Sequence, residues 1–163
     1  MDAKEAIRMS IKHADIIVDG YLEDLSDADL LVRPVPGANH IAWQLGHLIQ
    51  SEHDMLEMVA PGSMPELPEG FKQKHTSDTA GSDDPKAFLK KDEYQRLRRQ
   101  QRAGTLAALE TMSTDSLTKP GPEPMRDYFP TVADIVGGQS SHWLMHAGQW
   151  AVVRRKLGRK PLF

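Results

Sequence analysis

The sequence predicts an all-α protein, a four-helix bundle with a long crossover connection. Three observations support this fold class. Apolar residues recur at helical spacing in four segments, almost nothing alternates as a strand does, and two long irregular stretches separate the helices. The 163 residues suffice for one domain and contain no internal repeat, so residues 1–163 are expected to form a single domain.

The first two helices are bounded by turn-forming residues. Residues 2–24 carry apolar side chains every three or four positions, which indicates the first helix. The proline- and glycine-rich stretch 34–37 interrupts it. Asn39 is a good N-cap for a second helix, which runs to about Val59 because Pro61-Gly62 stops it.

A long polar connection, residues 61–84, follows the second helix. Its length indicates a crossover or a flap over a site, and we expect it to help form the site's entrance. Asp84 and Pro85 are predicted to cap and open the third helix, which reaches about Met112.

The last helix has the clearest boundaries. An irregular connector, residues 113–130, precedes Thr131 and Asp134, which resemble a capping box. The helix is predicted to end near Leu157, because Gly158 comes just after it.

Composition narrows the classes of function. The chain has no cysteine, so disulfides, thiolate ligands and a cysteine nucleophile are excluded. No segment approaches the ~20 apolar residues of a membrane span, and the N-terminal stretch lacks the apolar core of a signal peptide. The net charge of −3 argues against nucleic-acid binding. We therefore expect a cytoplasmic protein with neither a membrane nor a nucleic-acid partner.

Two histidines lie at the centre of the buried face of the last helix. His142 and His146 are four residues apart, so they share one side of the helix. At 100° per residue, mostly apolar positions fall within about 60° of them. Burying two neutral imidazoles costs free energy unless their nitrogens find partners, and a metal ion supplies one for each ring. The alternative is a pair satisfied within the core.

The second helix offers a third imidazole. His47 lies near the middle of a polar and aromatic face that adjoins the apolar stripe of this helix. The other members of that face are His40, Trp43, Gln44, Ser51 and Asp54. If the bundle places His47 opposite the histidine pair, three imidazoles meet at one point.

At these residues the chain resembles a known family. The stretches "AWQLGHLIQSE" and "HWLMHAGQWAVVRRKLGR" are similar to those of the DinB/YfiT-like superfamily. The resemblance implies an up-and-down-type four-helix bundle with one divalent metal ion held by His47, His142 and His146. It also implies thiol-dependent transferase or isomerase activity, although many members have no assigned reaction.

Three neutral histidines suit zinc or nickel first and iron next, and they leave a coordination position open for water or a low-molecular-weight thiol. His40 and Asp54 are candidates for a general base or for orienting His47; the alternatives are a first-turn helix residue and a solvated acid. Gln139, Gln149 and Trp43 are candidates for lining the pocket.

The predicted function is that of a metal-dependent, thiol-dependent S-transferase or isomerase acting on a small electrophilic molecule. The alternative is a non-catalytic stress-response or small-molecule-binding bundle whose metal is structural or vestigial.

Glu52 falls inside the apolar stripe of the second helix, so it is expected to be paired or to lie at a subunit interface. On that basis we also predict a homodimer.

Overall fold

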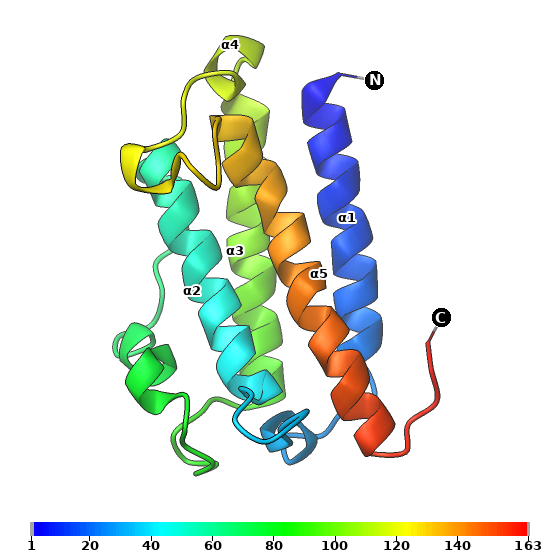
Figure 1. The fold of residues 1–163 in the computed structure, drawn as a ribbon. Helices are drawn as coiled ribbons and strands as arrows, with labels where there is room; N and C mark the ends of the chain where they lie inside the picture. The colour runs from blue at the N-terminus through cyan, green and yellow to red at the C-terminus, as the bar shows by residue number, and fades with distance from the viewer. Residues whose placement is uncertain (1, 163) are drawn as a thin grey trace.

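Four long helices lie side by side in the computed structural model, which describes residues 2–162 (Figure 1). They are α1 (Ala3–Leu22), α2 (Ile41–Val59), α3 (Lys91–Thr111) and α5 (Val132–Lys156). A one-turn helix, α4 (Thr114–Leu117), joins α3 to α5, and short 3-10 turns occupy the connections. Within residues 2–162 the β-structure is limited to one isolated bridge between Pro120 and Thr131. The predicted all-α bundle is therefore confirmed.

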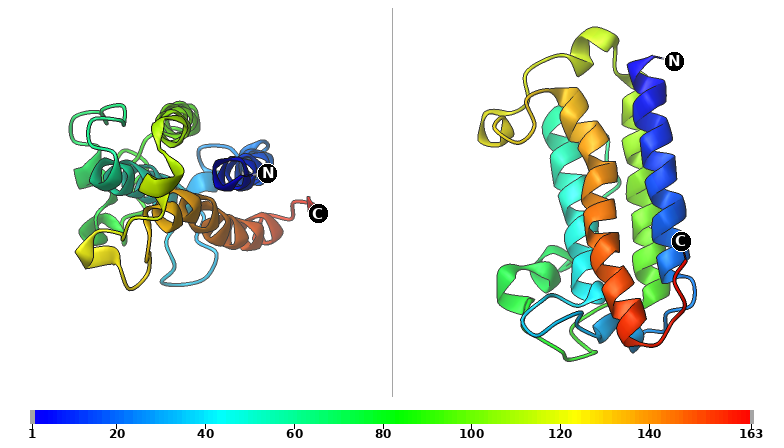
Figure 2. Two further views of the ribbon diagram at one scale, coloured as in Figure 1. Left: turned by 90° about the horizontal axis from the view of Figure 1, so that it is seen from above. Right: turned by 45° about the vertical axis from the view of Figure 1, so that its right-hand side comes forward.

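The direction of the helices explains the long connection. α1 and α5 run one way along the bundle, whereas α2 and α3 run the other way (Figures 1 and 2). Since α2 and α3 are parallel, the chain between them must return along the length of the bundle. The expected crossover is thus present, and the helix directions do not simply alternate.

The beginning of α2 differs from the prediction by one residue. His40, not Asn39, is the N-cap, because its Nδ1 accepts a hydrogen bond from the backbone N–H of Trp43 at 3.1 Å. The carbonyl of Asn39 instead accepts a hydrogen bond from the side-chain amide of Gln44 at 2.6 Å. An imidazole with a free ring nitrogen can replace the usual capping oxygen.

The prediction for the start of α3 was wrong. Asp84 begins a turn, in which its carbonyl accepts from the N–H of Ala87 and its carboxylate from the N–H of Lys86. α3 starts at Lys91, whose N–H donates to the carboxylate of Asp27 at 2.8 Å. Glu93 also accepts from the N–H of Lys90 at 3.3 Å, so the first turn is satisfied by one local acid and by one from the connection after α1.

The boundaries of α5 agree with the prediction. The hydroxyl of Thr131 accepts from the N–H of Asp134, and the carboxylate of Asp134 accepts from the N–H of Thr131. Gly158 has a φ of +70°, the left-handed conformation typical of the residue after a helix. The preceding connector holds α4, which the sequence analysis missed; its first turn is capped by the hydroxyl of Ser113.

Glu52 is fully buried and satisfied within the chain. Its carboxylate accepts hydrogen bonds from the indole N–H of Trp143 at 2.9 Å and the hydroxyl of Thr105 at 2.6 Å. A guanidinium nitrogen of Arg102 lies 3.1 Å away. Of the two alternatives for Glu52, pairing inside the bundle is therefore correct, and this residue no longer supports a dimer.

The helices of residues 2–162 include none with the length and hydropathy that a membrane span requires.

Candidate metal centre

Three histidine side chains converge between α2 and α5. One ring nitrogen from each of His47, His142 and His146 lies within 4.8 Å of the other two. The ring centroids are 5.2 Å apart for His47 and His142, 5.5 Å for His47 and His146, and 5.1 Å for the pair on α5. We call these three residues the histidine cluster. The antiparallel packing of α2 on α5 brings them together, as the buried faces of the two helices suggested.

Burial keeps the cluster in the form that binds metals. His146 is buried, while His47 and His142 are half-buried. Removal from water lowers the pKa of His142 to about 4 and that of His146 to about 4, with a further contribution from the neighbouring imidazoles. Burial also lowers the pKa of His47. All three rings are therefore neutral at pH 7, and each retains a nitrogen lone pair.

Gln44 organises the polar side of the cluster. Its amide nitrogen donates to the carbonyl of Asn39 at 2.6 Å and to the side-chain oxygen of Gln149 at 3.0 Å. Its amide oxygen accepts from the indole N–H of Trp150 at 2.7 Å. Because a carbonyl only accepts and an indole N–H only donates, these contacts fix which end of the amide is oxygen.

This orientation determines the tautomer of His146. Nδ1 of His146 lies 3.1 Å from the amide oxygen of Gln44, so Nδ1 carries the proton and donates it. Nε2 is then left with its lone pair. A hydrogen bond at the far nitrogen is the arrangement that orients metal-binding imidazoles in proteins. The sequence analysis placed Gln44 on the right face but missed this role; its position three residues before His47 was the available signal.

The ring of His47 is stacked against an aromatic ring of the same helix. Trp43 stacks on it with ring centroids 5.2 Å apart and an interplanar angle of 7°. The indole N–H of Trp43 donates to the carbonyl of Thr76 at 3.0 Å, which ties the ring to the crossover connection. Trp43, predicted to line the pocket, therefore lies against a residue of the histidine cluster.

The two predicted base candidates lie outside the histidine cluster. His40 is fully buried and both of its ring nitrogens are occupied, one by the N–H of Trp43 and the other, at 3.0 Å, by the carbonyl of Ser82. Asp54 forms an ion pair with Lys72 at 2.6 Å on the outer side of α2. These contacts favour the alternatives, a helix-capping residue and a solvent-facing acid, and give no support to a base role.

The two predicted glutamines differ. Gln149 reaches the histidine cluster through its hydrogen bond with Gln44. Gln139 is buried, and its amide nitrogen donates to the carbonyl of Ile135 at 3.0 Å and lies 3.2 Å from the sulfur of Met55. Its amide oxygen is buried without a protein partner among the described residues.

Another buried histidine, His75, which the sequence analysis missed, supports α2 from the crossover connection. Nδ1 of His75 donates to the carbonyl of Phe71 at 2.8 Å, and Nε2 accepts from the hydroxyl of Tyr94 at 2.7 Å. The ring rests on Gly46, where an added Cβ would lie 2.0 Å from it. His75 sits in a polar stretch without periodicity, so no pattern distinguished it.

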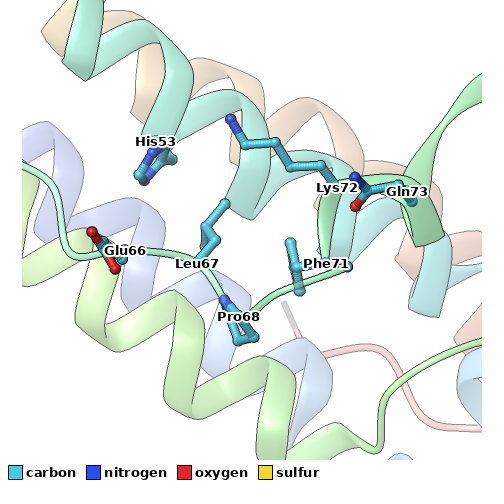
Figure 3. A pocket seen from close by; sticks show the side chains of 8 residues that line it. His53, Glu66, Leu67, Pro68, Phe71, Lys72 and Gln73 are labelled. Atoms are coloured by element: carbon cyan, nitrogen blue, oxygen red, sulfur yellow. The ribbon is translucent and has the colours of Figure 1, made fainter.

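Two hollows flank α2 and α5. One, of about 310 Å³, lies between α2 and the crossover connection; Figure 3 shows His53, Glu66, Leu67 and Lys72 around it. No member of the histidine cluster lines it. The other, of about 740 Å³, is lined by His142 and by residues of α5 and of the 113–130 connector. This groove is lined by residues outside 61–84, so it gives no support to the entrance expected at that connection.

The cluster fits a divalent ion. His47, His142 and His146 would hold the ion, because one nitrogen of each lies within 4.8 Å of the other two and imidazole nitrogen is a common ligand of late divalent metals. Among residues 2–162 the potential metal ligands that converge here are the three imidazoles of the histidine cluster.

The family model described as the DinB superfamily matches residues 17–150, which include all three histidines. No curated protein matches the chain significantly.

Proposed function

We propose, from the premise that the chain belongs to the DinB superfamily, that it is a metal-dependent enzyme whose divalent ion is held by His47, His142 and His146. The observation that carries the proposal is the convergence of three neutral imidazoles, one of them oriented by Gln44. Neutral imidazoles suit zinc or nickel first and iron next.

An open coordination position favours catalysis. Structural zinc sites are closed by four protein ligands, whereas catalytic sites have three and bind water or substrate in the fourth position. Within the described chain three ligands are available to one ion. When bound, the ion supplies Lewis acidity, which keeps a water or a thiol deprotonated at neutral pH.

The reaction we propose is the transfer of a low-molecular-weight thiol to a small electrophile. The thiol sulfur forms a bond to the electrophilic carbon, the leaving group departs with its electron pair, and the thiol proton passes to solvent. Gln44 and Trp43 hold the rings of His146 and His47 in place during this reaction. Solvent takes the proton because His40 and Asp54 are committed to other partners.

The experiment separates this function from a closed, structural metal site. Cobalt-substituted protein is mixed with imidazole or with 2-mercaptoethanol, and thiol consumption is then followed with 1-chloro-2,4-dinitrobenzene as the electrophile. We expect both ligands to change the cobalt absorption spectrum, and we expect thiol consumption to exceed that of His146→Ala. The matched control is His53→Ala, because His53 is on the same helix as His47 but bonds to Gln101.

A cobalt spectrum that no ligand changes, together with thiol consumption equal to that of His146→Ala, would contradict the enzyme proposal. That result would favour the non-catalytic bundle.

A further inference from the structure

The groove beside His142 has the form of a small-molecule site. Its volume of about 740 Å³ lies in the range typical of ligand pockets. α5 contributes a floor of small residues, Gly137, Gly138 and Ser141. The surrounding walls include Met55 from α2 together with Phe129 and Met145.

The groove is continuous with the histidine cluster. His142 belongs both to the lining of the groove and to the cluster, and it is half-buried. From the other helix Met55 also lines the groove, and its sulfur lies 3.2 Å from the amide nitrogen of Gln139, one turn before His142. A molecule in the groove therefore contacts the edge of the proposed metal centre.

Glycine shapes the floor of the groove. A Cβ on Gly138 would lie 2.6 Å from the ring of Phe129, so only glycine lets this ring pack directly against α5. A Cβ on Gly137 would meet nothing closer than Ile7 at 3.7 Å. The helix thus presents a flat surface beside an aromatic ring, which suits a flat ligand.

The charge of the groove selects against anions. The charged residue in its lining is Asp134, whose carboxylate already accepts hydrogen bonds from the N–H and hydroxyl of Thr131. The described lining contains no lysine or arginine that would pair with an anionic ligand. Two large side chains of the lining are strongly exposed, Tyr128 at 85% and Met145 at 60%. Covering them with an apolar molecule is favourable.

We propose that this groove binds the electrophilic substrate, and that this substrate is a neutral, apolar molecule with an aromatic-sized flat group. The assignment as a substrate subsite rests on the proposed function, whereas binding in the groove itself requires no metal ion.

The test uses two probes with the same skeleton. N-phenyl-1-naphthylamine is neutral, and 1-anilinonaphthalene-8-sulfonate carries an added sulfonate. Binding of each to the metal-free full-length protein is followed by fluorescence. We expect the neutral probe to bind at least about tenfold more tightly, because the groove offers no partner for the sulfonate.

Two phenylalanine variants locate the binding site. Ser141→Phe fills the floor of the groove and is expected to abolish binding of the neutral probe. Gly148→Phe is the matched control, because Gly148 is two turns further along α5, is exposed, and lies outside the groove with no atom within 4 Å of an added Cβ. Retained binding in Ser141→Phe, or equal affinity for both probes, would overturn the proposal.

Proximity to the metal centre is measured separately. Cobalt-loaded protein is expected to quench the bound neutral probe relative to zinc-loaded protein. Tight binding without quenching would overturn the subsite assignment and leave the metal centre itself unaffected. Loss of metal from the histidine variants bears instead on the proposed function. A wild-type dimer that dissociates on Ser141→Phe would assign the groove to a second copy of the chain and would also overturn the proposal.

Discussion

Two polar groups of the bundle differ in how their atoms are satisfied: the carboxylate of Glu52 on α2, and the histidine cluster between α2 and α5. The carboxylate of Glu52 has partners from two other helices, in the indole of Trp143, the hydroxyl of Thr105 and the guanidinium of Arg102. The histidine cluster has a protein partner for Nδ1 of His146, while one nitrogen of each ring faces the other two rings.

This difference in hydrogen-bond partners marks Glu52 as a structural residue and the histidine cluster as a candidate binding site. Glu52 needs nothing from outside the chain, so its burial contributes to the stability and register of the bundle. The histidine cluster instead turns one nitrogen of each neutral ring towards the other two, at a place where His47 and His142 are only half-buried. Three converging lone pairs offer a cation more than any one ring would.

The largest effect on stability is expected at Glu52. Glu52→Ala leaves the buried guanidinium of Arg102 without this partner, and should lower the free energy of unfolding by about 3–5 kcal/mol. Urea denaturation of the metal-free protein measures the change. His142→Ala removes a half-buried ring and should change the same quantity by less than about 1 kcal/mol. Equal losses for the two variants would show that the two groups do not differ as described.

The second prediction concerns pH and His75. Burial lowers the pKa of His75 from 6.5 to about 4, so between these values the unfolded chain binds a proton that the folded chain does not. The free energy of unfolding therefore keeps its full value above pH 6.5, where His75 is neutral in both states, and falls as the pH drops towards 4. The loss from this residue should be about 3 kcal/mol.

A matched variant isolates this contribution. His75→Gln keeps a donor for Phe71 and an acceptor for Tyr94 but does not titrate. Unfolding free energies of the metal-free protein, measured at pH 4 and pH 7, should depend less on pH in the variant than in the wild type. The same pH dependence in both proteins would show that His75 is not responsible.

The smallest predicted effect is at Gln44. Gln44→Leu removes the acceptor that fixes the tautomer of His146 and should weaken metal binding by about 10- to 100-fold. Gln44→Glu restores an acceptor for His146 and Trp150 and should recover part of the affinity. Competition with a chromophoric chelator measures both variants. Unchanged affinity in Gln44→Leu would mean that the ring of His146 is oriented by packing alone.

Local sequence predicted the elements whose ends are satisfied locally. The capping box of Thr131 and Asp134 and the terminal Gly158 bracket α5, and both ends were correct because these contacts span only a few residues. The start of α3 was misplaced although Glu93 caps the N–H of Lys90 locally, because the shorter contact, from Lys91 to Asp27, is distant in sequence.

The same distinction applies to the candidate site. Helical spacing placed His47 on one buried face and His142 with His146 on another, and the family resemblance supplied the prediction that the three meet, which they do. The role of Gln44 depends on partners about one hundred residues away, and that of His75 on a turn packed against Gly46. Such contacts become visible only once the helices are placed in three dimensions.

The central claim is that the histidine cluster binds one divalent ion. Equilibrium dialysis against zinc or nickel, followed by elemental analysis, measures the ratio of metal to chain for the wild type, His146→Ala and the control His53→Ala. We predict one ion per chain in the wild type and in His53→Ala, and none in His146→Ala. A full equivalent of metal retained by His146→Ala would contradict the claim.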